Sequence, residues 1–246
     1  MLKLDSSLVR SGNVLIKIRL FVYVTSLLHL VVVATHLLSQ DYSKSKDPNL
    51  QVYVKLKWKL ITAWFNLLTA PYILISIYCE WKALKRESQS KNILRLNKAR
   101  NFLFNSIILP VTLFGDILFW RIYNKDRRLL MPLSADEYIS MWNQHSMHTI
   151  SLLFVLFDLA CVPRKRPKNM TPQILALTAF LTLYVLVIAH SISKGEYVYP
   201  GIRLFSTNKL LVTCVYMYIA NFFYYTGQWF VVDLIWGQRG TRKKIA

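Results

Sequence analysis

Six stretches of nearly unbroken apolar residues alternate with polar, basic segments along the chain. A helix needs about 20 apolar residues to cross the roughly 30 Å hydrocarbon core of a bilayer, and each stretch is of that length. The pattern predicts an all-α polytopic membrane protein, with residues 1–246 forming one transmembrane bundle that ends in a basic tail at 237–246. Pro110, inside the third stretch, predicts a kink. The six predicted spans are about 20–38, 58–79, 101–123, 141–161, 172–190 and 210–236.

Composition supports this assignment, because 54% of the residues are hydrophobic and only 17% are charged. The net charge is +19, but the basic residues lie between the apolar stretches. There they set membrane topology and meet anionic headgroups, so we expect no nucleic-acid partner. We interpret the run Arg164-Lys165-Arg166 as such a topology anchor.

Six spans place both termini on one side of the membrane. The segments on that side carry 19 Lys and Arg residues, against 12 on the other side. The positive-inside rule therefore predicts cytosolic termini. The chain ends in Lys243-Lys244-Ile245-Ala246, which resembles the dilysine signal that returns membrane proteins to the endoplasmic reticulum, so we expect a multi-pass protein of that membrane. The sequon at Asn169 falls in a predicted cytosolic loop and should carry no glycan.

Polar residues inside the spans are aligned by helical spacing. They fall on one face of four of the six predicted helices, and such faces are expected to meet in the interior of the bundle. Histidine and aspartate at membrane depth are costly unless they face a polar interior, so they are candidates for function. The aligned sets are Thr62, Asn66, Thr69 and Ser76; Asn105, Thr112 and Asp116; Gln144, His145, His148, Ser151 and Asp158; and Asn221, Tyr225 and Gln228.

Two of these residues, Thr62 and His148, are predicted to lie at similar depths in the membrane. Under the predicted topology, Trp58 and Trp142 mark the lumenal interface of the second and fourth spans. Thr62 lies about 6 Å and His148 about 9 Å further in, at 1.5 Å per residue. A hydroxyl and an imidazole that can meet are the minimum parts for nucleophilic acyl transfer, in which histidine takes the hydroxyl proton.

The residue that orients His148 is left open by the sequence. Asp158 follows ten residues later, about 15 Å along the same helix, and is a poor candidate. Asp116 is suitable only if the third span packs beside the fourth.

The Cys and His patterns in the sequence give little support for a metal site or a cofactor. Cys79, Cys161 and Cys214 lie in or at the end of apolar runs and form no Cys-x-x-Cys pair, and the chain has no His-Glu-x-x-His. His29 and His36 are spaced like haem ligands, but no second span carries a matching pair. We expect neither a metal site nor a cofactor.

Several segments carry a family resemblance. They are Trp58-Lys59-Leu60-Ile61-Thr62, Phe119-Trp120-Arg121-Ile122-Tyr123 with Asp126-Arg127, His145-Ser146-Met147-His148-Thr149, and Val198-Tyr199-Pro200. From about Lys57 to Trp236 the chain resembles the androgen-induced-gene family of multi-span membrane proteins, whose members hydrolyse fatty-acid esters of hydroxy fatty acids.

The resemblance implies a threonine hydrolase acting on a lipid ester, with Thr62 as nucleophile and His148 as catalytic histidine. The polar neighbours His145, Asn66 and Gln144 are candidates for binding the substrate. Gln144 departs from the family pattern, in which we expect Asn, and the loops are more basic than in animal members.

Two other classes of function remain open. The chain would be a lipid-binding or scaffold protein if it kept the shape without the activity. It would be a small transporter if Asp116, Asp158 and His148 formed a polar path. Against transport, the spans show no evident internal repeat and no pair of Gly/Pro-broken helices. Nothing in the sequence indicates an oligomeric state.

Overall fold

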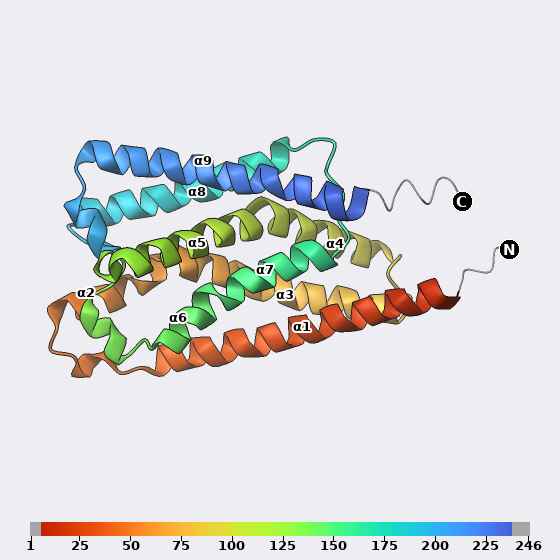
Figure 1. Ribbon diagram of the computed structural model, residues 1–246, viewed down its shortest axis with the longest axis horizontal. Coiled ribbons are helices and arrows are strands. Elements are labelled where there is room, and N and C mark those ends of the chain that lie inside the picture. Colours follow the sequence, from red (N-terminus) through yellow and green to blue (C-terminus); the bar gives the residue numbers. More distant parts are fainter. Residues whose placement is uncertain (1–5, 238–246) are drawn as a thin grey trace.

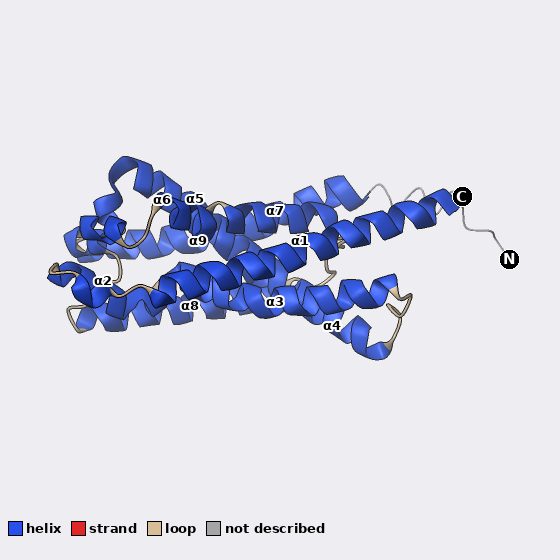
Figure 2. Cartoon of the chain, turned by 90° about the horizontal axis from the view of Figure 1, so that it is seen from below, coloured by secondary structure: helices blue, strands red, loops and turns tan. Residues whose placement is uncertain are grey.

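The computed structural model describes residues 6–237, with side chains from Gly12 on. Every regular element in that range is helical, and the long helices run lengthwise beside one another (Figures 1 and 2). The predicted all-α bundle is confirmed. The α-helices are α1 (Ser6–Ser39), α2 (Pro48–Leu56), α3 (Ile61–Leu84), α4 (Lys91–Leu103), α5 (Leu109–Asp126), α6 (Met141–His148), α7 (Ile150–Cys161), α8 (Thr171–Ser193) and α9 (Thr207–Val232).

Five helical segments among the described residues are long and apolar enough to cross a membrane, and they contain α1, α3, α4–α5, α8 and α9. Their outward faces are apolar, as lipid contact requires. Phe21, Leu183 and Phe223 are examples, each more than half exposed. The chain is therefore a multi-pass membrane protein.

The stretch 141–161, predicted as one continuous span, instead forms two shorter helices, α6 and α7, which are separated at Thr149. Side-chain hydrogen bonds compete with the backbone ladder at this point. The Ser151 hydroxyl oxygen lies 2.6 Å from the Met147 carbonyl oxygen, and the Thr149 hydroxyl lies 3.0 Å from Nδ1 of His145. The two helices still follow one another along the bundle, so the start of α1 and the end of α9 lie at the same end (Figure 1).

The third span is irregular at the predicted kink. A π-helical turn, Phe104–Ile108, joins α4 to α5 just before Pro110. Proline has no N–H to give to a carbonyl of the preceding turn, and in a membrane such a carbonyl must find another donor. The Gln228 side chain of α9 donates to the Asn105 carbonyl at 2.8 Å, which ties α9 to the turn.

The aligned polar residues face the interior, as predicted, with one clear exception. Ser76, Asn105, Thr112, Asp116, Gln144, His148, Asp158, Asn221 and Gln228 are all buried, whereas His145 is exposed. Asn221 and Tyr225 of the sixth predicted span make structural bonds. The Asn221 amide donates to the Met217 carbonyl, and the Tyr225 hydroxyl donates to Gln173.

Buried ion pairs join the helices at the end of the bundle where α1 begins. Glu80 of α3 accepts hydrogen bonds from Arg19 of α1 at 2.6 Å and from Arg100 of α4 at 2.9 Å. All three side chains are at most 9% exposed. The carboxylate thus connects three helices.

Arg164 belongs to a second buried cluster. Its guanidinium pairs with Asp158 and lies 4.0 Å from the centre of the Phe104 ring. The Tyr23 and Tyr72 hydroxyls also donate to Asp158, at 2.6 and 2.7 Å. Arg164 therefore does not meet lipid headgroups, because a partly apolar neighbourhood with a carboxylate holds its side chain inside, and the topology that the run was predicted to set stays a prediction. The next two basic residues, Lys165 and Arg166, are exposed.

Candidate functional site

A cavity of about 390 Å³ opens between α1, α3, α5 and α6. It lies toward the end of the bundle that is opposite the start of α1, where α2 and the first turns of α3 and α6 are found (Figure 1). Its lining is mostly apolar and comes largely from α1 and α3. The polar residues among the lining include Thr62, Asn66, Gln144 and His148. A cavity of this size and lining suits an acyl chain with a few polar atoms.

His148 is fixed in orientation by two neighbours. Its Nδ1 lies 2.9 Å from Oδ1 of Asp116, and its ring stacks on Phe119 with centroids 3.5 Å apart and planes within 8°. His148 is 4% exposed and Asp116 is fully buried. If Asp116 is ionised it only accepts hydrogen bonds, which assigns the hydrogen of His148 to Nδ1 and the lone pair to Nε2. Nε2 has no hydrogen-bond partner among the described residues.

Asp116 is held in its turn by Ser151. The serine hydroxyl donates to Oδ2 at 2.5 Å, while Oδ1 faces the imidazole. The pairing arises because α5 packs against α6 and α7, which was the condition for choosing Asp116. Asp158, the other aspartate considered, is committed to Arg164 and two tyrosines. Along α7, Phe154 and Val155 are buried between Ser151 and Asp158.

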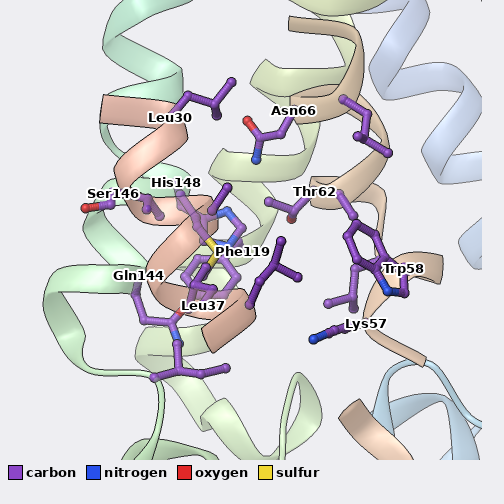
Figure 3. Close-up of a pocket in the computed structure, with 18 of the residues that line it drawn as sticks. Leu30, Leu37, Lys57, Trp58, Thr62, Asn66, Phe119, Gln144, Ser146 and His148 are labelled. Atoms are coloured by element: carbon purple, nitrogen blue, oxygen red, sulfur yellow. The ribbon is translucent and has the colours of Figure 1, made fainter. Parts of the chain in front are cut away.

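Thr62 lies on the opposite wall of the same cavity. Figure 3 shows Thr62 and Asn66 on α3, facing His148, Phe119 and Gln144 across the space. The Thr62 hydroxyl makes no hydrogen bond within the described residues and is not joined to His148. Catalytic hydrogen bonds are often long before substrate binds, so this separation is compatible with a base and nucleophile pair.

Thr62 is the second residue of α3, because the helix begins at Ile61 and not at Trp58, where the predicted span starts. Backbone N–H groups in a first helical turn have no carbonyl partner within the helix, and this end of the helix carries partial positive charge. Leu60, the N-cap residue, supplies no side-chain bond, and Ile61 N–H is bonded by the Tyr199 hydroxyl at 3.2 Å. Burial raises the pKa of Tyr199, which keeps this hydroxyl protonated.

The three predicted substrate-binding residues take different positions. Asn66 lines the cavity one turn after Thr62. Gln144 also lines it, and its amide lies 3.4 Å from the Met131 sulfur. His145 does not line the cavity. It is exposed, and its ring lies 4.7 Å from that of Trp120.

Polar residues of the second, third and fourth predicted spans meet behind the main cavity. A second, smaller cavity of about 30 Å³ lies there, lined by Thr69, Thr112, Ser151 and, in common with the first, Asn66. Within residues 6–237 no cluster of His, Cys, Asp and Glu could hold a metal ion.

Reasoning from the sequence missed three contributors to the site. Phe119 and Tyr199 stand in segments that carry the family resemblance, but nothing in their spacing revealed that one stacks on His148 and the other caps α3. Lys57 lines the cavity as well. Its position beside Trp58 indicated a membrane interface. It did not indicate that the Lys57 side chain points into the cavity.

Comparison with known proteins shows which family the chain resembles. The family model for FAR-17a/AIG1-like protein matches residues 20–231. The chain is 28% identical over 169 residues to the human androgen-dependent TFPI-regulating protein, covering 68% of this chain and 73% of that protein. It is 25% identical over 193 residues to the human androgen-induced gene 1 protein, covering 72% and 80%.

A third relative is the golden hamster (Mesocricetus auratus) androgen-dependent TFPI-regulating protein, which is 28% identical over 149 residues, or 61% of this chain. The chain spans 64% of the length of that relative. No solved structure gives a significant match. Because the family model covers nearly the whole bundle, including both walls of the cavity, the chain belongs to the FAR-17a/AIG1-like protein family.

Proposed function

We propose that this protein is an intramembrane lipid ester hydrolase that cleaves fatty-acid esters of hydroxy fatty acids. The observation that carries the proposal is the Asp116–His148 pair, which leaves Nε2 of the imidazole unbonded beside a cavity that Thr62 also lines. A carboxylate that fixes the tautomer of a histidine, and a hydroxyl that lines the same cavity as the other ring nitrogen, are the parts of a nucleophilic triad. The family resemblance supplies the substrate class.

The first half-reaction forms an acyl-enzyme. Nε2 of His148 accepts the Thr62 hydroxyl proton as Oγ1 attacks the ester carbonyl carbon, and Asp116 stabilises the imidazolium that results. The tetrahedral intermediate collapses when the imidazolium gives its proton to the departing alcohol oxygen. The hydroxy fatty acid leaves, and the other fatty acid remains esterified to Thr62.

The second half-reaction restores the enzyme. Nε2 takes a proton from water, the hydroxide oxygen attacks the acyl-Thr62 carbonyl, and the proton then returns to Oγ1 as the free fatty acid leaves. Water reaches the site from the end of the bundle at which the cavity lies.

The negative oxygen of the tetrahedral intermediate needs hydrogen-bond donors, and α3 offers two kinds. The Thr62 N–H lies in its first turn, at the positive end of the helix dipole, whereas the N–H groups of Ile61, Ala63 and Trp64 already have acceptors. The Asn66 amide follows one turn later on the same wall. We assign the oxyanion to these donors, since preorganised donors of this type contribute about 10²–10³-fold in rate each.

The test uses purified protein in detergent and a fluorophosphonate probe. Wild type should be labelled at Thr62, as located by peptide mass spectrometry, and should hydrolyse a fatty-acid ester of a hydroxy fatty acid. Thr62→Ala and His148→Ala should do neither at matched folded amounts. Thr178→Ala is the control, because its hydroxyl bonds back to its own helix in α8, away from the cavity. A folded wild type that neither labels nor turns over the ester would leave lipid binding or transport as the function.

A further inference from the structure

The large cavity contains one feature that the proposed chemistry does not use. Among the described residues that line it, Lys57 is the only Lys or Arg, and none is Asp or Glu. Figure 3 shows the Lys57 side chain directed into the same space as Thr62. A cation without a counter-charge in a mostly apolar cavity is costly unless an anion binds beside it.

Among the residues that the structure describes, the partners of the Lys57 ammonium are aromatic. Its ammonium nitrogen lies 5.5 Å from the centre of the Tyr42 ring and 5.9 Å from that of Trp58. Such contacts orient an ammonium group without neutralising it. No ion pair involving Lys57 is found within the described residues.

Lys59, two residues later, provides an internal comparison. Its ammonium pairs with Glu196 at 2.8 Å, it does not line the cavity, and its hydrogen bond lowers the pKa of the Glu196 carboxyl. The same short turn thus holds one neutralised lysine and one that is free to meet a ligand. The turn includes Trp58, which is half exposed at the predicted interface, where an anionic group can remain partly hydrated.

We propose that Lys57 binds the free carboxylate of the substrate and so selects lipid esters that carry an acid group. The proposal rests on the proposed hydrolase function and adds a specificity residue to it. Lys57 acts in binding and positioning, because its ammonium meets the carboxylate while Thr62 and His148 act on the ester.

The spacing between Lys57 and Thr62 along the chain also bears on how far the ester lies from the carboxylate. Lys57 and Thr62 are five residues apart, a backbone separation of about 8 Å if helical throughout and about 17 Å if fully extended. A 3-10 turn, Lys57–Lys59, occupies part of this interval and shortens it. A substrate whose carboxylate and ester are separated by several methylene groups fits this spacing. An ester on the carbon next to the carboxylate should be a poor substrate.

The experiment compares an ester of a hydroxy fatty acid with the methyl ester of the same molecule, in which the carboxylate is masked. Wild type should show a higher kcat/KM on the free acid, by about 10–100-fold for a charge-assisted hydrogen bond. Lys57→Gln should lose that factor on the free acid and hydrolyse the methyl ester within about threefold of wild type. Lys57→Arg should keep most of the preference, and Lys55→Gln, on exposed α2 surface, should behave as wild type.

Two readouts separate this proposal from the proposed function. Fluorophosphonate labelling of Thr62 uses a neutral probe, so Lys57→Gln should label at the wild-type rate. Equal kcat/KM values for acid and methyl ester in a wild type that labels would refute the role of Lys57 while leaving the hydrolase intact. No labelling and no turnover of either ester in wild type would instead remove the hydrolase.

Two sources can supply the anion that binds Lys57: the carboxylate of the substrate or the headgroup of an anionic phospholipid. Nanodiscs with neutral lipid alone and with added anionic phospholipid distinguish these sources. If Lys57→Gln alters both substrates equally and only in the anionic discs, the assignment to the substrate carboxylate is wrong.

Discussion

Asp116→Asn is the sharpest perturbation of the proposed site, because it removes one charge and keeps the shape. In the structure Oδ1 faces Nδ1 of His148 and Oδ2 accepts the Ser151 hydroxyl. An asparagine can still accept from Nδ1–H through its oxygen, while its amide donates to Ser151. The serine hydroxyl can turn to the Met147 carbonyl, which already lies 2.6 Å away. The variant should therefore fold.

The expected loss follows from the charge alone. When His148 becomes an imidazolium during the reaction, a carboxylate at 2.9 Å attracts it by about 6 kcal/mol at an effective dielectric constant near 20. A neutral hydrogen bond to asparagine retains part of this, which leaves roughly 3–5 kcal/mol. At 1.36 kcal/mol per factor of ten, kcat should fall by about 10²–10⁴-fold.

The assay is single-turnover hydrolysis at matched folded amounts, with Asp126→Asn as the control. Asp126 is the last residue of the same helix, and its carboxylate pairs with exposed Arg128, away from the cavity. That variant should retain wild-type kcat. If Asp116→Asn stays within about threefold of wild type while His148→Ala is inactive, Asp116 does not assist His148 and the reasoning fails.

Three further predictions concern the buried contacts between the helices and the topology of the chain in the membrane. Glu80→Gln should lower the free energy of unfolding by about 3–5 kcal/mol, because it leaves the buried guanidinium groups of Arg19 and Arg100 without a counter-charge. Thermal unfolding in detergent measures this loss, and an unchanged melting temperature would contradict the prediction. Gln228→Leu should cost about 1–3 kcal/mol by leaving the Asn105 carbonyl without a donor, whereas Thr226→Ala, exposed on the same helix, should cost far less in the same assay. Asn169 should stay unglycosylated in cells, and a mobility shift that an endoglycosidase reverses would overturn the predicted topology.

The apolar stretches and the helical spacing of polar residues were enough to predict an all-α membrane bundle and the interior face of several helices. Both are local properties, since a helix turns about 100° per residue whatever its neighbours are. The resemblance carried by the segments around Thr62 and His148 pointed to the family, which the family model confirms. The roles of these two residues, the location in the endoplasmic reticulum and the cytosolic termini stay predictions. The dilysine tail itself lies outside the described residues.

Tertiary structure decided which residues become partners, because that depends on which helices are neighbours. Packing of α5 against α6 and α7 selected Asp116 for His148 and left Asp158 to pair with Arg164. The same packing brought the side chain of Arg164, predicted from its charge and flanking position to be part of a topology anchor, into the interior. The sequence gives the direction of each side chain about its own helix axis, but the distances between helices are set only when all the faces are packed together.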